Sequence, residues 1–328
     1  MTEMPPRLTH YLEWWLLKGI LPLMQRGDMT TACSVTRSIA RFARTILKRE
    51  WQWARQNIRL VYGPQLSEEE VARLATLAFE NVFISHLEGI RIKDVEVRSV
   101  GVEAMWQAME LGRGMVMCSI HLGSWEPMLK HMAELGFPLT VVYRHASNPL
   151  TEKLFMSMRA DYGVKWARRS DVRTIVTTMR QQETVGLMMD INTVQGGLPV
   201  PFLGAPALCP PGAAKLARQF QVPLALGVCV REAPGKAALH VIDVIAPPSR
   251  LGGDEVLLDL TSKINALFAP WVHDYAEQYN WLHGRWKTRQ DGTNRTPEQL
   301  TAELWPQRQE PFAEITPRIR KILAGETL

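Results

Sequence analysis

Short apolar runs alternate with longer amphipathic stretches between about residue 100 and residue 280. The runs have the length and composition of buried strands, and the stretches have the period of helices. Strands are predicted at Met115–Ile120, Leu139–Tyr143, Val185–Met189, Leu224–Val230 and Leu239–Ile245. Helices are predicted at Val71–Ile90, Val102–Leu111, Trp125–Leu135, Leu150–Tyr162, Val172–Gln182, Gly212–Gln219, Val256–Tyr279 and Glu314–Leu323. This alternation predicts an α/β sandwich with a largely parallel central sheet.

The amino terminus carries an apolar helical segment, Tyr11–Met24, but no secretory signal. A membrane-spanning helix needs about 20 predominantly apolar residues. This segment is shorter, and Lys18 at its centre would cost about 3 kcal/mol on insertion. We therefore predict an interfacial or shallowly dipping anchor, with Trp14 and Trp15 at the depth of the lipid headgroups.

The next helical segment is amphipathic and basic. Its apolar stripe is Val35, Ile39, Phe42 and Ile46, and its basic row is Arg37, Arg41, Arg44 and Lys48. One interpretation is binding to a membrane surface. The other is an ordinary helix with its apolar face in the core and its cations in water.

Composition narrows the choice of partners. The 328 residues carry a formal charge of +5, which indicates an anionic partner: nucleic acid, an anionic membrane surface or an acidic carrier protein. Tryptophan is frequent, with 11 residues against 6 tyrosines, which favours the membrane interface. Nucleic acid is the weakest candidate because no reader motif accompanies the basic residues. The four scattered cysteines have neither metal-ligand nor redox spacing, so we predict free thiols. The eight histidines are dispersed as well, and we expect neither a metal nor a cofactor.

The strongest candidate for chemistry is His121-Leu-Gly-Ser-Trp-Glu126, where a predicted strand ends and a helix begins. In one continuous helix, residues five apart point about 140° away from each other. A turn at Gly123 and Ser124 would let the Glu126 carboxylate fold back onto an imidazole nitrogen of His121. Such a pair can deprotonate an alcohol as a general base. The alternative is structural: a histidine satisfied in a turn and an acid at a helix N-terminus.

Three further motifs follow this one in the chain. They are Tyr143-Arg144 with Asn148-Pro149-Leu150, then Asp190 with Gly196, Gly197, Val200, Phe202 and Gly204, and finally Glu277, Gln278, Tyr279, Trp281, His283, Arg285, Trp286 and Lys287. Together with His121 and Glu126, in this order, they resemble the late acyltransferases of lipid A biosynthesis, within the glycerolipid acyltransferase superfamily. The resemblance covers the chain from the amino-terminal segment to about residue 290.

The resemblance implies roles for individual residues. His121 would be the general base and Glu126 its partner. Arg144 and Arg169 would bind phosphate, although the neighbouring Arg168 could replace Arg169. The remaining implied substrate-binding residues are Asn148 and Asp190.

Several of these residues have a plainer alternative. Asp190 could orient an arginine or a sugar hydroxyl, or it could belong to a buried ion pair. Arg144 could be a solvated surface charge. Gly196 and Gly197 could present amides to an oxyanion or form a plain turn. Trp281, His283 and Arg285 are interpreted as structural.

We therefore predict an O-acyltransferase at the cytoplasmic face of the bacterial inner membrane. It would move an acyl chain from acyl-carrier protein, or from acyl-CoA, to a hydroxyl of a lipid A precursor. Residues 1–30 would associate with the membrane, residues 31–290 would form the acyltransferase domain, and residues 291–328 would be a peripheral tail. The alternatives are transfer to another bacterial glycolipid, hydrolysis of an acyl thioester, and a non-catalytic lipid-binding assembly protein.

Overall fold

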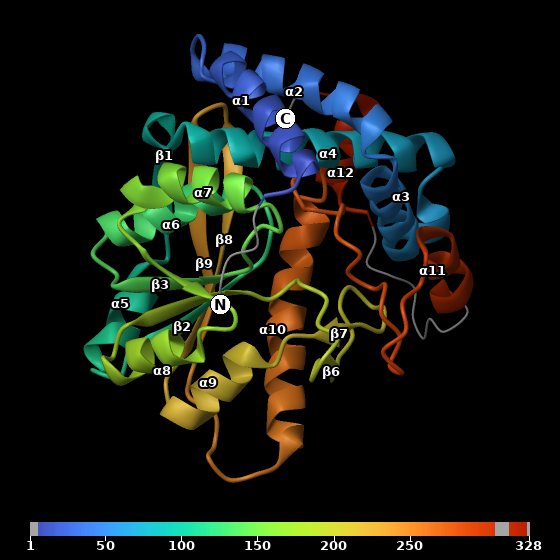
Figure 1. Cartoon of the computed structure of the whole chain (residues 1–328). Helices are drawn as coiled ribbons and strands as arrows, with labels where there is room; N and C mark the ends of the chain where they lie inside the picture. Colours follow the sequence, from blue (N-terminus) through green and yellow to red (C-terminus); the bar gives the residue numbers. More distant parts are fainter. Residues whose placement is uncertain (1–5, 306–314, 327–328) are drawn as a thin grey trace.

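A computed structural model describes residues 6–305 and 315–326 of the chain. Within these residues, seven strands form the central sheet in the order β1-β9-β8-β2-β5-β3-β4 (Figure 1). The strands are β1 Glu96–Val100, β2 Met115–Ser119, β3 Leu139–Tyr143, β4 Lys165–Arg168, β5 Thr184–Met188, β8 Leu224–Ala233 and β9 Lys236–Ile245. All neighbouring pairs are parallel except β8 and β9. The prediction of an α/β fold with a largely parallel sheet is confirmed.

Helices cover both faces of this sheet. They are α1 Leu8–Met24, α2 Met29–Ile46, α3 Lys48–Tyr62, α4 Glu68–Ile90, α5 Glu103–Glu110, α6 Trp125–Glu134, α7 Pro149–Met158, α8 Val172–Arg180, α9 Gly212–Phe220, α10 Asp254–Asp274, α11 Pro297–Leu304 and α12 Pro317–Ala324. Short 3₁₀ helices lie at Gly63–Gln65, Ile92–Asp94 and Arg159–Tyr162 (η3), and a two-stranded ribbon joins β6 Leu198–Pro199 to β7 Leu208–Cys209. Helix α4 starts after Ser67, where Ser67 and Glu70 form a reciprocal capping box.

The sheet separates two hydrophobic clusters. On the face covered by α6, Met117 and Val141 pack with Met128 and Met132 of that helix. On the opposite face, side chains such as Val116 pack against α8, α9 and α10. We call these the α6 face and the α9 face; the two helices lie on opposite sides of the sheet in Figure 1. Because both faces are buried, the strands of the sheet centre are apolar on both sides.

Helix α2 departs from one of its two interpretations, the one in which its whole apolar face lies in the core. Its buried side is made of small residues, among them Ala32, Thr36 and Ala40, and it lies along α4. The Arg41 guanidinium bonds Glu80 of α4, and Phe42 and Ile46 are 68% and 66% exposed. The outer part of the predicted apolar stripe therefore points to solvent instead of the core. Small residues permit a closer approach between helices, so they take the interior side.

The amino-terminal and carboxy-terminal helices lie at the edges of this architecture. Helix α1 contacts α2 and α7. Among the helices of the described ranges, none combines the length and the apolar character needed to cross a bilayer. At the other end, Leu300 of α11 and Ile319 of α12 are fully buried and join the main core cluster. The region predicted as a peripheral tail therefore contributes to the core, while the predicted start of its last helix, Glu314, lies outside the described residues.

Candidate active site

His121 and Asp190 meet at the carboxyl edge of the sheet. Strands β2 and β5 are parallel neighbours, with Ser119 opposite Met188, so the residues that follow each strand lie next to each other. The Asp190 carboxylate binds His121 twice: Oδ1 lies 2.9 Å from the ring Nδ1, and Oδ2 accepts the backbone N–H of His121 at 2.9 Å. Strand order thus brings together two residues that are 69 positions apart. Ligands and catalytic groups gather at this edge in open α/β sheets.

The electrostatics of this pair favour an ionised Asp190. Its side chain is fully buried, and burial alone would raise its pKa. The facing His121 charge and the two hydrogen bonds outweigh burial, so the pKa of Asp190 is lowered to about 2. For His121, burial would lower the pKa, but the charges of Asp190 and Glu126 raise it above its ordinary value.

An ionised carboxylate can only accept hydrogen bonds, so Nδ1 of His121 must carry the proton. Burial and the nearby Asp190 charge raise the pKa of Tyr279, so its hydroxyl stays protonated beside this carboxylate. In the neutral ring the lone pair is then on Nε2, which has no hydrogen-bond partner within the described part of the chain. The arrangement presents a fixed base.

Glu126 occupies a different position from the predicted one. It lies buried in the first turn of α6, and both its oxygens bind the guanidinium of Arg159, at the start of η3. That guanidinium also stacks over the Trp166 ring, 4.7 Å from its centroid. The expected contact between Glu126 and the imidazole is therefore replaced by the Asp190 contact. Glu126 acts on His121 only through its charge, which helps to raise the pKa of the ring.

The turn between His121 and Glu126 is confirmed, and neighbouring backbone holds it. Gly123 has φ +61°, and a Cβ there would lie 2.3 Å from the carbonyl oxygen of Cys229 in β8. That same oxygen accepts the Ser124 N–H at 2.7 Å, and the Gly123 N–H donates to the Gln278 carbonyl at 3.1 Å. The hydroxyl of Ser85 in α4 donates to the Gly123 carbonyl at 2.6 Å. Glycine is therefore required both for its backbone conformation and for its lack of a side chain.

A buried ion pair supports this turn from behind. Arg231 of β8 and Glu88 of α4 bind through two hydrogen bonds, and both side chains are buried. The same guanidinium bonds Asn81 and Ser85 of α4. Leaving either charge alone in this position would be costly, so the pair fixes α4 against β8.

A cavity of about 780 Å³ opens at His121. Its interior is lined by apolar side chains from the sheet and from α6, α8 and α9. Its lining also includes four cations, Arg144, Arg169, Lys215 and Lys287, and none of them forms an ion pair among the described residues. Unpaired arginine and lysine side chains are suited to phosphate oxygens.

The structure separates the adjacent arginines that the sequence could not. Arg169 lines the cavity, whereas Arg168 is not among the lining residues. Asp190 was predicted to bind substrate, with a buried ion pair as the alternative. It forms such a pair with His121. Trp281 and Arg285, which were interpreted as structural, are buried, and Arg285 donates to the carbonyl of Leu208 at 3.0 Å.

Asn148 is engaged at both ends of its amide. Its Oδ1 caps α7 by accepting the Leu150 N–H at 3.0 Å, and its Nδ2 donates to the carbonyl of His10 in α1 at 2.9 Å. An asparagine followed by proline is a common helix start, which explains the cap. Asn148 therefore joins α1 to α7 in this structure, and it does not line the cavity.

The chain bends at Gly196, in the segment that follows β5. Gly197 is packed so closely that an added Cβ would lie 2.2 Å from the Thr193 carbonyl oxygen, while Gly196, at φ +66°, lines the cavity.

His283 also lines the cavity, with its ring centroid 5.0 Å from that of His121. No cluster of side chains that could hold a metal ion occurs in the described ranges. Arg159 belonged to no recognisable motif, so sequence reasoning had no signal for it.

A histidine held by a buried acid at the end of parallel strands, facing an apolar cavity lined with cations, is an arrangement that suits an enzyme. The chain belongs to the family of bacterial lipid A biosynthesis acyltransferases, which matches residues 1–288. It is therefore an acyltransferase.

Curated relatives support the same assignment. The lipid A biosynthesis palmitoleoyltransferase of Escherichia coli (strain K12) is 25% identical over 296 residues, covering 86% of this chain and 93% of that protein. The lipid A biosynthesis lauroyltransferase of the same organism is 25% identical over 308 residues, covering 89% and 98%. A lipid A biosynthesis acyltransferase of Shigella flexneri is 25% identical over 296 residues, covering 86% and 93%.

Proposed function

We propose that this acyltransferase moves a fatty acyl chain from the thioester of an acyl-carrier protein to a hydroxyl of a lipid A precursor. The observation that carries the proposal is the His121–Asp190 pair facing a cavity that is apolar inside and also lined by cations. The apolar interior suits the acyl chain, and the cations suit phosphate groups. The names of the relatives support lipid A precursors as acceptors.

In the proposed mechanism, Nε2 of His121 accepts the proton of the acceptor hydroxyl as its oxygen attacks the thioester carbonyl. Asp190 holds the ring in the required tautomer and stabilises the imidazolium that forms. Collapse of the tetrahedral intermediate breaks the carbon–sulfur bond, and the imidazolium returns the proton to the leaving thiolate. One ester and one thiol are formed from one thioester and one alcohol, so no serine or cysteine nucleophile is needed.

The cations of the cavity would bind phosphate. Arg144 and Arg169 are exposed and line the cavity. They follow β3 and β4, and in the sheet β3 is the neighbour of β5, the strand that precedes Asp190, while β4 is the next strand outward. Phosphates occur both in lipid A precursors and in the prosthetic arm of a carrier protein. Lys215 and Lys287 extend the same positive lining. Electrostatic steering toward this opening would favour encounter with both substrates.

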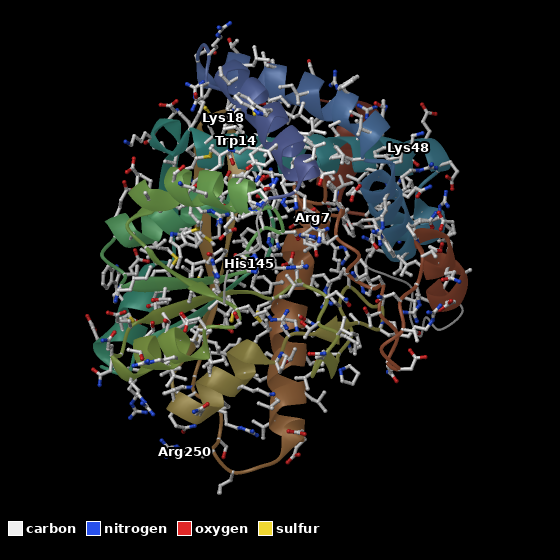
Figure 2. All side chains as sticks on the ribbon, in the orientation of Figure 1. Arg7, Trp14, Lys18, Lys48, His145 and Arg250 are labelled. Atoms are coloured by element: carbon white, nitrogen blue, oxygen red, sulfur yellow. The ribbon has the colours of Figure 1, made fainter. Side chains whose placement is uncertain are left out.

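Helices α1 and α2 would rest on the cytoplasmic face of the inner membrane. Their outward side chains include Leu12, Trp15 (64% exposed) and Phe42. Figure 2 shows Trp14 and Lys18 on α1, and the Lys18 ammonium lies 4.4 Å from the Trp14 ring centroid. Exposed apolar and aromatic residues with nearby cations are typical of an interfacial helix. Leu12→Glu should reduce sedimentation with anionic vesicles several-fold against native protein; unchanged sedimentation would remove the support for α1 as the contact.

The test of the main proposal is transfer by purified protein beside His121→Ala. Each receives acyl-carrier protein loaded with a labelled acyl chain and a lipid A precursor, and products are read by mass spectrometry. We expect a lipid heavier by one acyl chain with native protein, and a loss of at least 10³-fold in rate with the variant.

His131→Ala is the matched control. This histidine lies on α6 and bonds the Ser99 hydroxyl at 2.7 Å, and it does not line the cavity. The control should transfer at close to the native rate. Loss of thioester without an acylated lipid would indicate a hydrolase or a different acceptor. Rapid transfer by His121→Ala would rule out His121 as the base.

A further inference from the structure

The cavity at His121 reaches both faces of the sheet. Residues 186 to 189, at the end of β5, all line it. Successive side chains of a strand point to opposite faces, so two of these residues face each side. Residues from the two separate hydrophobic clusters also line the cavity. The cavity therefore has an α6-face branch and an α9-face branch, which meet at the sheet edge beside His121.

The α6-face branch is the better place for a hydrocarbon chain. Its apolar lining is Met117, Met128, Leu129, Leu139, Val141 and Trp166. Its charged side chains, Glu126 and Arg159, are bound to each other. Lys215, which also lines the cavity, lies in α9, on the other face of the sheet.

Gly186 lies deep in this branch. Pairing in the sheet places it beside Met117 of β2 and Val141 of β3, so the three residues form one row across the strands. At about 3.3 Å per residue, this row is about 7 Å deeper than Ser119 and Met188, the last residues of β2 and β5. A chain that begins beside His121 and follows the strands inward must pass Ser119 before it reaches the row.

No backbone requirement explains glycine at position 186. Its φ is not in the left-handed region, so any residue could adopt the conformation. A Cβ added there would lie 3.2 Å from Cδ1 of Leu139 and 3.8 Å from Cγ2 of Val141, inside the lining of the cavity. Glycine in a strand interior often marks a place where a ligand approaches closely. A side chain at position 186 would therefore have to displace Leu139, which lines the same branch.

We propose that the α6-face branch holds the donor acyl chain and that Gly186 sets the chain length it accepts. The inference rests on the proposed function, since it assigns a place to the chain that is transferred. The thioester carbonyl would lie at His121, and the methyl end would reach the row of Met117, Gly186 and Val141. A side chain at position 186 would shorten the space available to that end.

The test compares kcat/KM for carrier protein loaded with acyl chains of graded length. Gly186→Ala and Gly186→Val should move the preferred chain to shorter lengths, with the larger substitution giving the larger shift. The expected change in the ratio between adjacent lengths is about tenfold or more, the usual discrimination of an apolar pocket for small length differences. Thermal unfolding of each variant checks that it is folded.

Two further variants make the result decisive. Leu216→Phe fills the α9-face branch and should leave the ranking of chain lengths unchanged. Leu129→Ala enlarges the α6-face branch without touching the strand, and it should favour longer chains even if the Gly186 variants fail to fold. An unchanged ranking in the folded Gly186 and Leu129 variants, or a shift caused by Leu216→Phe instead, would overturn the inference. If native protein transfers no chain of any length, the proposed function itself fails.

Discussion

Asp190 and Glu126 are both buried carboxylates with a basic partner, but their partners differ in what they can do. Asp190 binds His121, whose charge changes near neutral pH. Glu126 binds Arg159, which remains charged at any working pH. Only the first pair can therefore take up and release a proton during a reaction. The second pair fixes α6 against η3 and contributes a constant negative charge to the neighbourhood of His121.

Of the substitutions at the two carboxylates, Asp190→Asn should cause the larger loss of activity. An asparagine amide keeps the shape, but it can donate to Nδ1 and so hold the ring in the tautomer that cannot act as a base at Nε2. We expect kcat to fall by about 10³- to 10⁴-fold while the protein remains folded. The measurement is single-turnover transfer, with circular dichroism as the check of folding.

A fall of less than about tenfold in Asp190→Asn would contradict this role. It would show that Asp190 serves mainly to hold the loop after β5, through the backbone N–H of His121.

Glu126→Gln should have a smaller effect on the reaction and a clear effect on stability. Breaking a fully buried pair costs about 3–5 kcal/mol, and the partial exposure of Arg159 reduces this to about 2 kcal/mol.

The loss of the Glu126 charge should also lower the pKa of His121, which that charge now raises. The base is active above its pKa, so native kcat/KM should rise with pH through a value above the ordinary histidine pKa of about 6.5. The rise in Glu126→Gln should come at lower pH.

Glu134→Gln is the matched control for this variant. Glu134 is also in α6, but it is exposed and binds Lys130 one turn away. It should change neither the pH profile nor the denaturant midpoint by a measurable amount. A pH profile in Glu126→Gln that coincides with the native one would show that the charge of Glu126 does not reach His121.

The sequence predicted the parts of the site that are local. The position of His121 after a strand and the turn at Gly123 depend on neighbouring residues, and both predictions are confirmed. The pairing of His121 with Asp190 depends on β2 and β5 being adjacent, and strand order is not encoded in any local pattern. The five-residue spacing suggested Glu126 instead.

Contacts between elements that are distant in the sequence also explain two other differences between the prediction and the structure. Arg159 reaches Glu126 only because η3 lies next to α6, and no motif marked this residue. In α2, the interpretation with the whole apolar face in the core is wrong, because the side that lies along α4 carries small residues such as Ala32 and Ala40. Strands β1 and β4, which lie at the two edges of the sheet, were not predicted, because edge strands lack a fully apolar run.

The backbone clasp around His121 has a consequence for how the protein is made. Gln278 accepts the Gly123 N–H, and Asn280 donates its N–H to the His121 carbonyl at 2.9 Å. A chain emerging from the ribosome contains both His121 and Asp190 long before these last two residues appear. The turn at His121 is therefore completed only after residues 278 to 280 have been made, and a nascent chain that stops before residue 278 carries His121 and Asp190 without the backbone contacts that hold them.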